Sequence, residues 1–169
     1  FDHLDKIWDV CDVIGFNYYY SQKAGPVAAL GLGSHRGPNF TEMGWDIDPA
    51  GLYKQIRLVG KRYGKPMMIT ENGIATQDEA QRKRYLGEHI AAVQQAREDG
   101  HDVRGYFVWS LLDNYEWHYG YDATFGLGKM NPKTYARELK PSAFAYRDII
   151  RRGGVKQIPA AVLKASESK

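Results

Sequence analysis

The sequence has almost no cysteine and no long apolar run. Its single cysteine, Cys11, has no second thiol in the 169-residue chain with which to form an internal disulfide. A reducing compartment, the cytoplasm, is therefore the expected location. No apolar stretch approaches the roughly 18 residues that a membrane span requires, and the opening Phe1-Asp2-His3 lacks the basic start and apolar stretch of a leader. We expect neither a membrane anchor nor a signal peptide in these residues.

The sequence also lacks an excess of charge of one sign and any motif for metal or phosphate. Lys and Arg total 23 and Asp and Glu total 20, and this net charge of +3 is too small and too evenly mixed to predict a nucleic-acid partner. The five histidines share no metal-ligand spacing, and the glycines of "GLGSHRG" lack the G-x-G-x-x-G spacing of a phosphate-binding loop. We expect no nucleic acid, no metal and no dinucleotide.

What the sequence does contain is an alternation of β-rich and helical stretches. Three stretches rich in β-branched and aromatic residues, 13–19, 66–70 and 104–110, predict short buried strands. Helical patterns occupy 48–65, 76–100 and 140–154, with apolar residues at spacings of three and four, as in Leu52, Ile56 and Val59. Strands that alternate with helices of this length indicate βαβ units. We therefore predict an α/β fold with a parallel sheet.

Further details of the fold follow from the same patterns. The strands lack polar alternation, which is typical of a sheet covered on both faces. Thr76 and Glu79 have capping-box spacing at the start of the second helix. Two long loops, 21–47 and 111–139, are of the length that is usually functional. Residues 155–169 are expected to form a trailing tail, which leaves 1–154 as the folded part.

The C-terminal ends of the three predicted strands carry polar and aromatic residues. In parallel sheets the working residues lie at these ends, which here hold "NYY" at 17–19, Glu71 with Asn72, and Trp109 ahead of "DNYEW" at 113–117. A sugar stacks its C–H faces on indole and needs carboxylate and amide partners for its hydroxyls. This combination of residues therefore favours a carbohydrate site.

Each of these residues also has a plainer interpretation. Glu71 stands before Asn-Gly and could simply open a surface turn. Trp109 lies on an apolar strand and could be a core residue, and Tyr19 could serve packing alone. Glu116 could pair with any surface Lys or Arg.

Three motifs in order resemble one enzyme family. "DVIGFNYY", "ITENGIA" and "WSLLDNYEW" followed by "GY" and "FGL" are similar to the C-terminal part of family 1 glycoside hydrolases, the retaining β-glycosidases and β-glucosidases. The later "LKPSAFAYRDII" resembles the last barrel helix of that family. The resemblance implies that the chain forms the C-terminal portion of a (β/α)8 TIM barrel, strands six to eight with their helices.

The resemblance also implies a role for each strand-end residue. In this family the glutamate of T-E-N-G, here Glu71, is the catalytic nucleophile, and the second tyrosine of N-Y-Y, here Tyr19, hydrogen-bonds it. The other matched positions contact a β-glucoside or related β-glycoside: Asn17, Trp109 as a platform, Glu116 and Trp117 as hydroxyl partners, and Phe125 as a side wall. No cofactor is implied, because glycosyl transfer through two carboxyl groups needs none.

The chain departs from the family pattern at the second catalytic carboxyl. In the family this group comes from an N-E-P motif, and the sequence contains no Asn-Glu-Pro triplet. A whole (β/α)8 barrel also needs at least about 200 residues. The outer strands of a partial barrel would present unpaired backbone groups. We therefore expect a complementary N-terminal barrel chain as a partner.

Two functions are consistent with these observations. The first is the nucleophile-bearing part of a retaining β-glycosidase, inactive without the N-terminal half. The second is a non-catalytic remnant that binds carbohydrate or serves only as a subunit. The presence of Glu71, Tyr19 and Trp109 together favours the first.

Overall fold

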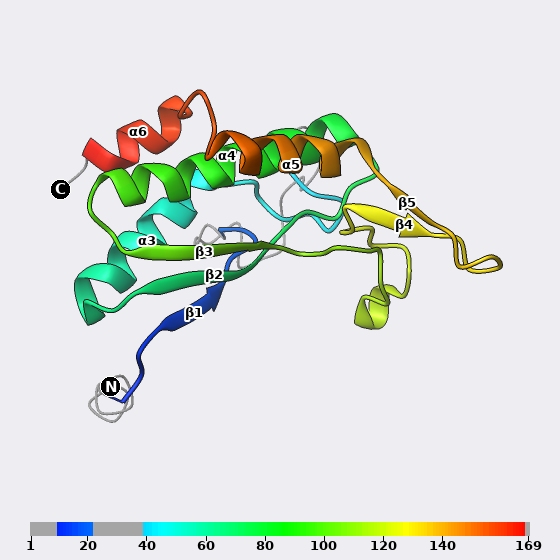
Figure 1. The fold of residues 1–169 in the computed structure, drawn as a ribbon, viewed down its shortest axis with the longest axis horizontal. Coiled ribbons are helices and arrows are strands. Elements are labelled where there is room, and N and C mark those ends of the chain that lie inside the picture. The colour runs from blue at the N-terminus through cyan, green and yellow to red at the C-terminus, as the bar shows by residue number, and fades with distance from the viewer. Residues whose placement is uncertain (1–9, 22–38, 168–169) are drawn as a thin grey trace, which may run out of the picture.

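Strands and helices alternate in the order that the sequence predicts. The computed structural model describes residues 10–21 and 39–167, so most of the predicted loop at 21–47 lies outside the described residues. The elements in chain order are β1 (Ile14–Asn17), α3 (Pro49–Tyr63), β2 (Met67–Asn72), α4 (Glu79–Glu98), β3 (Val103–Val108), the 3-10 turn η1 (Trp117–Tyr119), β4 (Gly128–Met130), β5 (Arg137–Leu139), α5 (Pro141–Arg152) and α6 (Ala160–Glu167) (Figure 1).

The three longer strands form a parallel sheet in the order β1-β2-β3, which confirms the predicted sheet. Ile14 lies opposite Met67, and Met67 lies opposite Val103. Because the strands are parallel, their C-terminal ends meet at one edge of the sheet. The short strands β4 and β5 pair antiparallel to each other. They lie in the predicted loop at 111–139, to which the sequence pattern assigned no strands.

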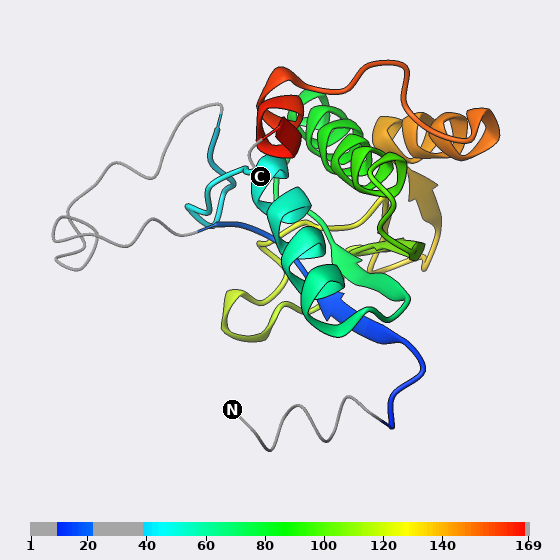
Figure 2. The same ribbon diagram turned by 90° about the vertical axis from the view of Figure 1, so that its left-hand side faces the viewer.

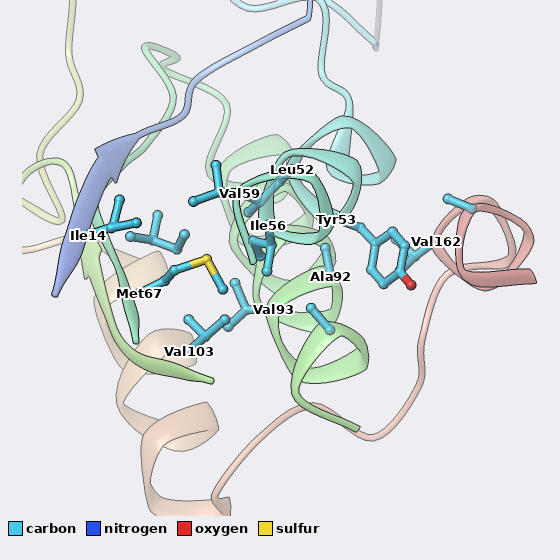
Figure 3. Close-up of a cluster of buried hydrophobic side chains, with 13 residues drawn as sticks. Ile14, Leu52, Tyr53, Ile56, Val59, Met67, Ala92, Val93, Val103 and Val162 are labelled. Carbon is cyan, nitrogen blue, oxygen red and sulfur yellow. The ribbon is translucent and has the colours of Figure 1, made fainter. Parts of the chain in front are cut away.

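Helices α3 and α4 cover one face of the sheet and form the main core with it. Helix α3 begins after Asp48, whose carboxylate accepts a hydrogen bond from the Gly51 N–H at 2.9 Å, and ends at Gly64, whose φ of 61° is left-handed. Its apolar face meets the sheet and α4 (Figure 3). The buried residues of this core are Ile14, Leu52, Tyr53, Ile56, Val59, Met67, Ile69, Ala92, Val93, Ala96, Val103, Val162 and Ala165.

The opposite face of the sheet carries no helix within the described part of the chain. Gly15, Asn17 and Thr70 are exposed there, and Phe107 is 53% exposed. The Thr70 hydroxyl donates to the Asn17 side-chain oxygen at 2.6 Å, which places these two residues on the same face. The expectation of a sheet covered on both faces was therefore wrong for these residues. A face that turns towards the interior of a barrel needs no helix of its own.

Helix α4 begins two residues later than the capping-box prediction. Its N-cap is Asp78, whose carboxylate accepts from the N–H groups of Ala80 at 2.8 Å and Gln81 at 3.2 Å. The Thr76 hydroxyl accepts instead from the Asp78 N–H at 3.1 Å. The prediction was wrong because Asp78 lies closer to the first turn and satisfies two of its free N–H groups with one carboxylate.

Residues 155–169 are not simply a trailing tail. Residues 160–167 form α6, in which Val162 is 0% exposed and Ala165 is 5% exposed. Both side chains belong to the α3–α4 core, and Figure 2 shows α6 alongside these helices. The sequence pattern missed α6 because an eight-residue helix is stabilised by packing more than by its own propensity.

Candidate active site

The C-terminal ends of β1 and β2 place the predicted nucleophile next to its predicted partners. Asn17, the last residue of β1, lies opposite Glu71 of β2. The Tyr18 N–H continues the pairing by donating to the Glu71 carbonyl oxygen at 2.9 Å. The Glu71 side chain is half-buried at this edge of the sheet. The Glu71 carboxylate therefore lies at the C-terminal edge of the sheet.

The residues after Glu71 run into the protein and not into a surface turn. Asn72 is 0% exposed and Gly73 is buried. A Cβ on Gly73 would lie 1.7 Å from the carbonyl oxygen of Trp109, so the chain can pass the end of β3 this closely only with glycine. The plainer interpretation of Glu71, as the start of a surface turn, was therefore wrong.

Tyr19 and Glu71 form the central contact of the site. The Tyr19 hydroxyl donates to Glu71 Oε2 at 2.5 Å, at the short end of the range for a hydroxyl that donates to a carboxylate. Burial, followed by this hydrogen bond and by the charge of Glu71, raises the pKa of the Tyr19 hydroxyl well above its ordinary value. Tyr19 therefore stays protonated and donates. Glu71 Oε1 takes no part in this contact.

Trp109 and Phe125 lie beside this pair in one aromatic cluster. Phe125 is 2% exposed, and its ring meets Tyr19 edge-on with centroids 6.0 Å apart. The half-buried Trp109 packs against the same cluster. Phe125 thus packs against the Tyr19 ring, and its role as a side wall of the sugar site stays a prediction. Trp109 remains partly accessible, as a platform requires.

Glu116 and Trp117 come from the loop after β3. Glu116 is the N-cap residue of η1 and is half-buried. After burial and the contributions of Glu71, the charge of Glu116 raises the pKa of Tyr19 further, so Glu116 lies in the neighbourhood of Tyr19. Trp117 is 81% exposed, and in the described part of the chain it packs against no buried cluster. The structure brings Glu116 towards the pair and leaves Trp117 at the rim.

Asn17 lies next to the pair without bonding to it. Its side-chain oxygen accepts from Thr70, and the residue is exposed on the helix-free face of the sheet. Asn17 is thus an exposed amide beside the end of β2, and its contact with a sugar stays a prediction.

The sequence pattern gave no indication of Trp45, which belongs to the aromatic cluster. Its indole stacks on Tyr20 with centroids 4.8 Å apart and meets Tyr19 edge-on at 5.8 Å. It comes from the loop at 39–48, which has no periodicity from which burial could be inferred. Trp45 and Phe125 together hold the Tyr19 ring on two sides.

Arg82 is the second residue that sequence analysis missed. It is 1% exposed and forms an ion pair with Glu79 at 2.8 Å. Its guanidinium joins the chain after β2 to the chain before β4 by donating to the carbonyl oxygens of Ile74, Thr76, Thr124 and Phe125. Its position three and four residues before the buried Tyr85 and Leu86 indicates the buried face of α4.

The described residues contain neither a metal site nor a membrane-spanning helix. No group of three or more His, Cys, Asp or Glu side chains among residues 10–21 and 39–167 could hold a metal ion. In the same part of the chain, no helix has the length and apolar character to cross a membrane.

Comparison with known proteins then identifies the family. The family model described as glycosyl hydrolase family 1 matches residues 2–155. The chain belongs to this family. Among its family 1 relatives, Beta-glucosidase A of Acetivibrio thermocellus is 37% identical over 169 residues, which cover 90% of this chain and 38% of that protein. A Beta-galactosidase of Sulfolobus acidocaldarius is 39% identical over 157 residues, 85% of this chain and 32% of that protein.

Solved family 1 structures have the same fold. The β-glucosidase from Thermotoga maritima in complex with castanospermine matches with a TM-score of 0.80 and 32% identity, covering 92% of this chain and 38% of that one. The resemblance found in the sequence is thereby confirmed, and the fold corresponds to part of a TIM barrel. This family 1 chain spans well under half the length of the relatives that it matches.

Proposed function

We propose that the chain is the nucleophile-bearing portion of a retaining β-glycosidase acting on β-glucosides or related β-glycosides, with β1, β2 and β3 as the sixth to eighth strands of its barrel. The observation that carries the proposal is the 2.5 Å hydrogen bond from Tyr19 to Glu71 at the joint end of β1 and β2. Relatives named β-glucosidase and β-galactosidase support the substrate class.

Glu71 is the attacking group in this proposal. Its Oε1 forms a bond to the anomeric carbon while the bond from that carbon to the leaving oxygen breaks, which gives a covalent glycosyl-enzyme. A second carboxyl about 5 Å away protonates the leaving oxygen and later removes a proton from the water that releases the sugar. Tyr19 holds Oε2 by its hydrogen bond, so Oε1 is left for attack.

The surrounding residues bind the sugar. Trp109 offers a partly accessible indole for the C–H face of the ring. Glu116 supplies a carboxylate for charge-assisted hydrogen bonds to hydroxyls, and Asn17 supplies an amide. Hydrogen bonds of this kind contribute to rate when they strengthen as the ring distorts towards the transition state.

The second carboxyl and the earlier strands come from a complementary segment in this proposal. The sequence has no Asn-Glu-Pro triplet, and the helix-free face of the sheet exposes Phe107 and Thr70. A segment that carries the first five strands would cover this face and complete the pair of carboxyls. The chain by itself would then be inactive.

Turnover of an aryl β-glucoside tests the proposal. The chain is coexpressed with the N-terminal portion of the Thermotoga maritima β-glucosidase that it does not cover, and the copurified complex is assayed. Glu71→Gln should reduce kcat by at least about a thousand-fold, as expected for the loss of a nucleophile. Glu98→Gln, at an exposed position of α4, is the matched control and should change little. Full activity of Glu71→Gln would contradict the proposal, and an inactive folded complex would favour the non-catalytic remnant.

A further inference from the structure

A buried polar cluster lies directly behind the Tyr19–Glu71 pair. Asn72 at its centre is 0% exposed. Its side-chain amide donates to the Tyr18 carbonyl oxygen at 2.6 Å and to the Tyr85 hydroxyl at 2.9 Å. Its side-chain oxygen accepts from the Tyr106 hydroxyl at 2.5 Å. Both N–H groups and the oxygen of the Asn72 side-chain amide are therefore engaged in hydrogen bonds.

Tyr85 extends this cluster to the backbone of Tyr19. It lies on α4, is 0% exposed, and donates its hydroxyl to the Tyr19 carbonyl oxygen at 2.9 Å. The same hydroxyl accepts from Asn72, so its one donor and its acceptor are both engaged. The backbone carbonyl of Asn72 also accepts from the Trp109 N–H at 2.9 Å.

Asn72 and Tyr85 thus connect the C-terminal ends of all three strands. Tyr18 and Tyr19 follow β1, Asn72 ends β2, and Trp109 follows β3. Every hydrogen bond in the cluster has a fixed direction, because reversing one would leave a buried donor or acceptor without a partner. A cluster with a single arrangement holds the backbone of the three strand ends at fixed separations.

We propose that Asn72 and Tyr85 are positioning residues that hold the backbone of Tyr19 where its hydroxyl meets Glu71. This inference rests on the proposed function, because it deepens the account of the same site. Neither residue touches the sugar. Each acts through Tyr19. The Tyr19 hydroxyl reaches Oε2 of Glu71 only when the Tyr19 backbone stays at a fixed separation from the end of β2.

Packing alone does not require the Tyr85 hydroxyl. The Tyr85 ring stacks on His89 with centroids 3.8 Å apart, and phenylalanine would keep that contact. The hydroxyl contributes its hydrogen bonds, among them those to Asn72 and to the Tyr19 carbonyl. Tyr85→Phe therefore separates positioning from packing.

The experiment follows the ionisation of Tyr19 by NMR in the copurified complex, with ¹³C-labelled tyrosine and Tyr19→Phe to assign the signal. In the unsubstituted complex Tyr19 should stay protonated at about pH 11, one unit above the ordinary tyrosine pKa. In Tyr85→Phe it should ionise at a lower pH than in the unsubstituted complex, because the ring loses its fixed place against Glu71. The matched control is Tyr53→Phe, which removes another buried hydroxyl, donated to Asp99 at 2.7 Å, from the α3–α4 core.

The outcomes separate this inference from the proposed function. Ionisation of Tyr19 at a lower pH in Tyr85→Phe and not in Tyr53→Phe supports the inference, and an unchanged or equal response in the two variants overturns it. Asn72→Ser removes the amide that orients Tyr85 and should lower the Tyr19 pKa in the same way. A normal titration in that variant also overturns the inference. In the turnover assay Tyr85→Phe should lower kcat about ten-fold at similar KM, whereas an inactive unsubstituted complex would count against the proposed function alone.

Discussion

At the residue scale, the site is a carboxylate held by one phenol, with aromatic rings around the phenol. Glu71 and Tyr19 could be predicted because both stand in motifs at strand ends, where parallel sheets place working residues. Trp45 and Arg82 could not be predicted with the same ease. Trp45 lies in a loop without periodicity. Arg82 stands in a run of basic residues, and only its spacing from Tyr85 distinguishes it as buried.

The buried His89 predicts how stability depends on pH. Burial lowers the pKa of His89 from 6.5 to about 4. Because the folded state disfavours the charged ring, the unfolded chain binds the proton first as the pH falls below 6.5. The contribution of His89 is therefore complete above pH 6.5 and is lost between pH 6.5 and 4, by about 3 kcal/mol.

Urea unfolding of the complex at a fixed protein concentration, at pH 7 and pH 4.5, measures this loss. His89→Gln should show a much weaker dependence over this range. His118→Gln, which replaces an exposed histidine, should keep the dependence of the unsubstituted protein. Equal pH dependence of the two variants would show that His89 is not its source.

At the scale of elements, the sequence predicted the longer helices and the parallel strands and missed the shortest elements. Helices α3, α4 and α5 have recognisable first and last residues, and the three parallel strands are short apolar runs. Strands β4 and β5 have three residues each, too few for any pattern. Helix α6 lacks a cap signal and owes its place to contacts with α3 and α4 that no local pattern reveals.

The packing of α6 predicts that a charged side chain on its buried face destabilises the fold. Val162→Asp places an unpaired carboxylate against α3 and α4 at a side chain that is 0% exposed. It should lower the free energy of unfolding by at least about 2 kcal/mol. Leu163→Asp changes the next residue, which is 41% exposed, and should cost well under half as much. Similar losses for both substitutions in urea unfolding would show that α6 does not dock as described.

At the scale of the whole molecule, the described sheet has two outer strands, β1 and β3, and one face without helices. Unpaired strand edges and an exposed Phe107 favour association with another chain. The chain covers 38% of the Thermotoga maritima enzyme. The expectation of a complementary segment rests on the three strands and on the absence of an Asn-Glu-Pro triplet, and it stays a prediction.

The predicted need for a complementary segment can be measured by size-exclusion chromatography and thermal unfolding. The chain alone should elute as a broad or associated species and melt without a sharp transition. Together with the complementary segment it should elute as a one-to-one complex and melt cooperatively. A monomeric chain that melts cooperatively without the segment would contradict this prediction.

The most direct test of the account is intact-mass analysis of the complex after incubation with a 2-deoxy-2-fluoro β-glucoside bearing an activated leaving group. Such a reagent traps the glycosyl-enzyme without needing a strong general acid. The account predicts one added sugar on this chain, located by peptide mapping on Glu71 and missing in Glu71→Gln. An adduct on another carboxylate, or a folded and complete complex that acquires none, would contradict it.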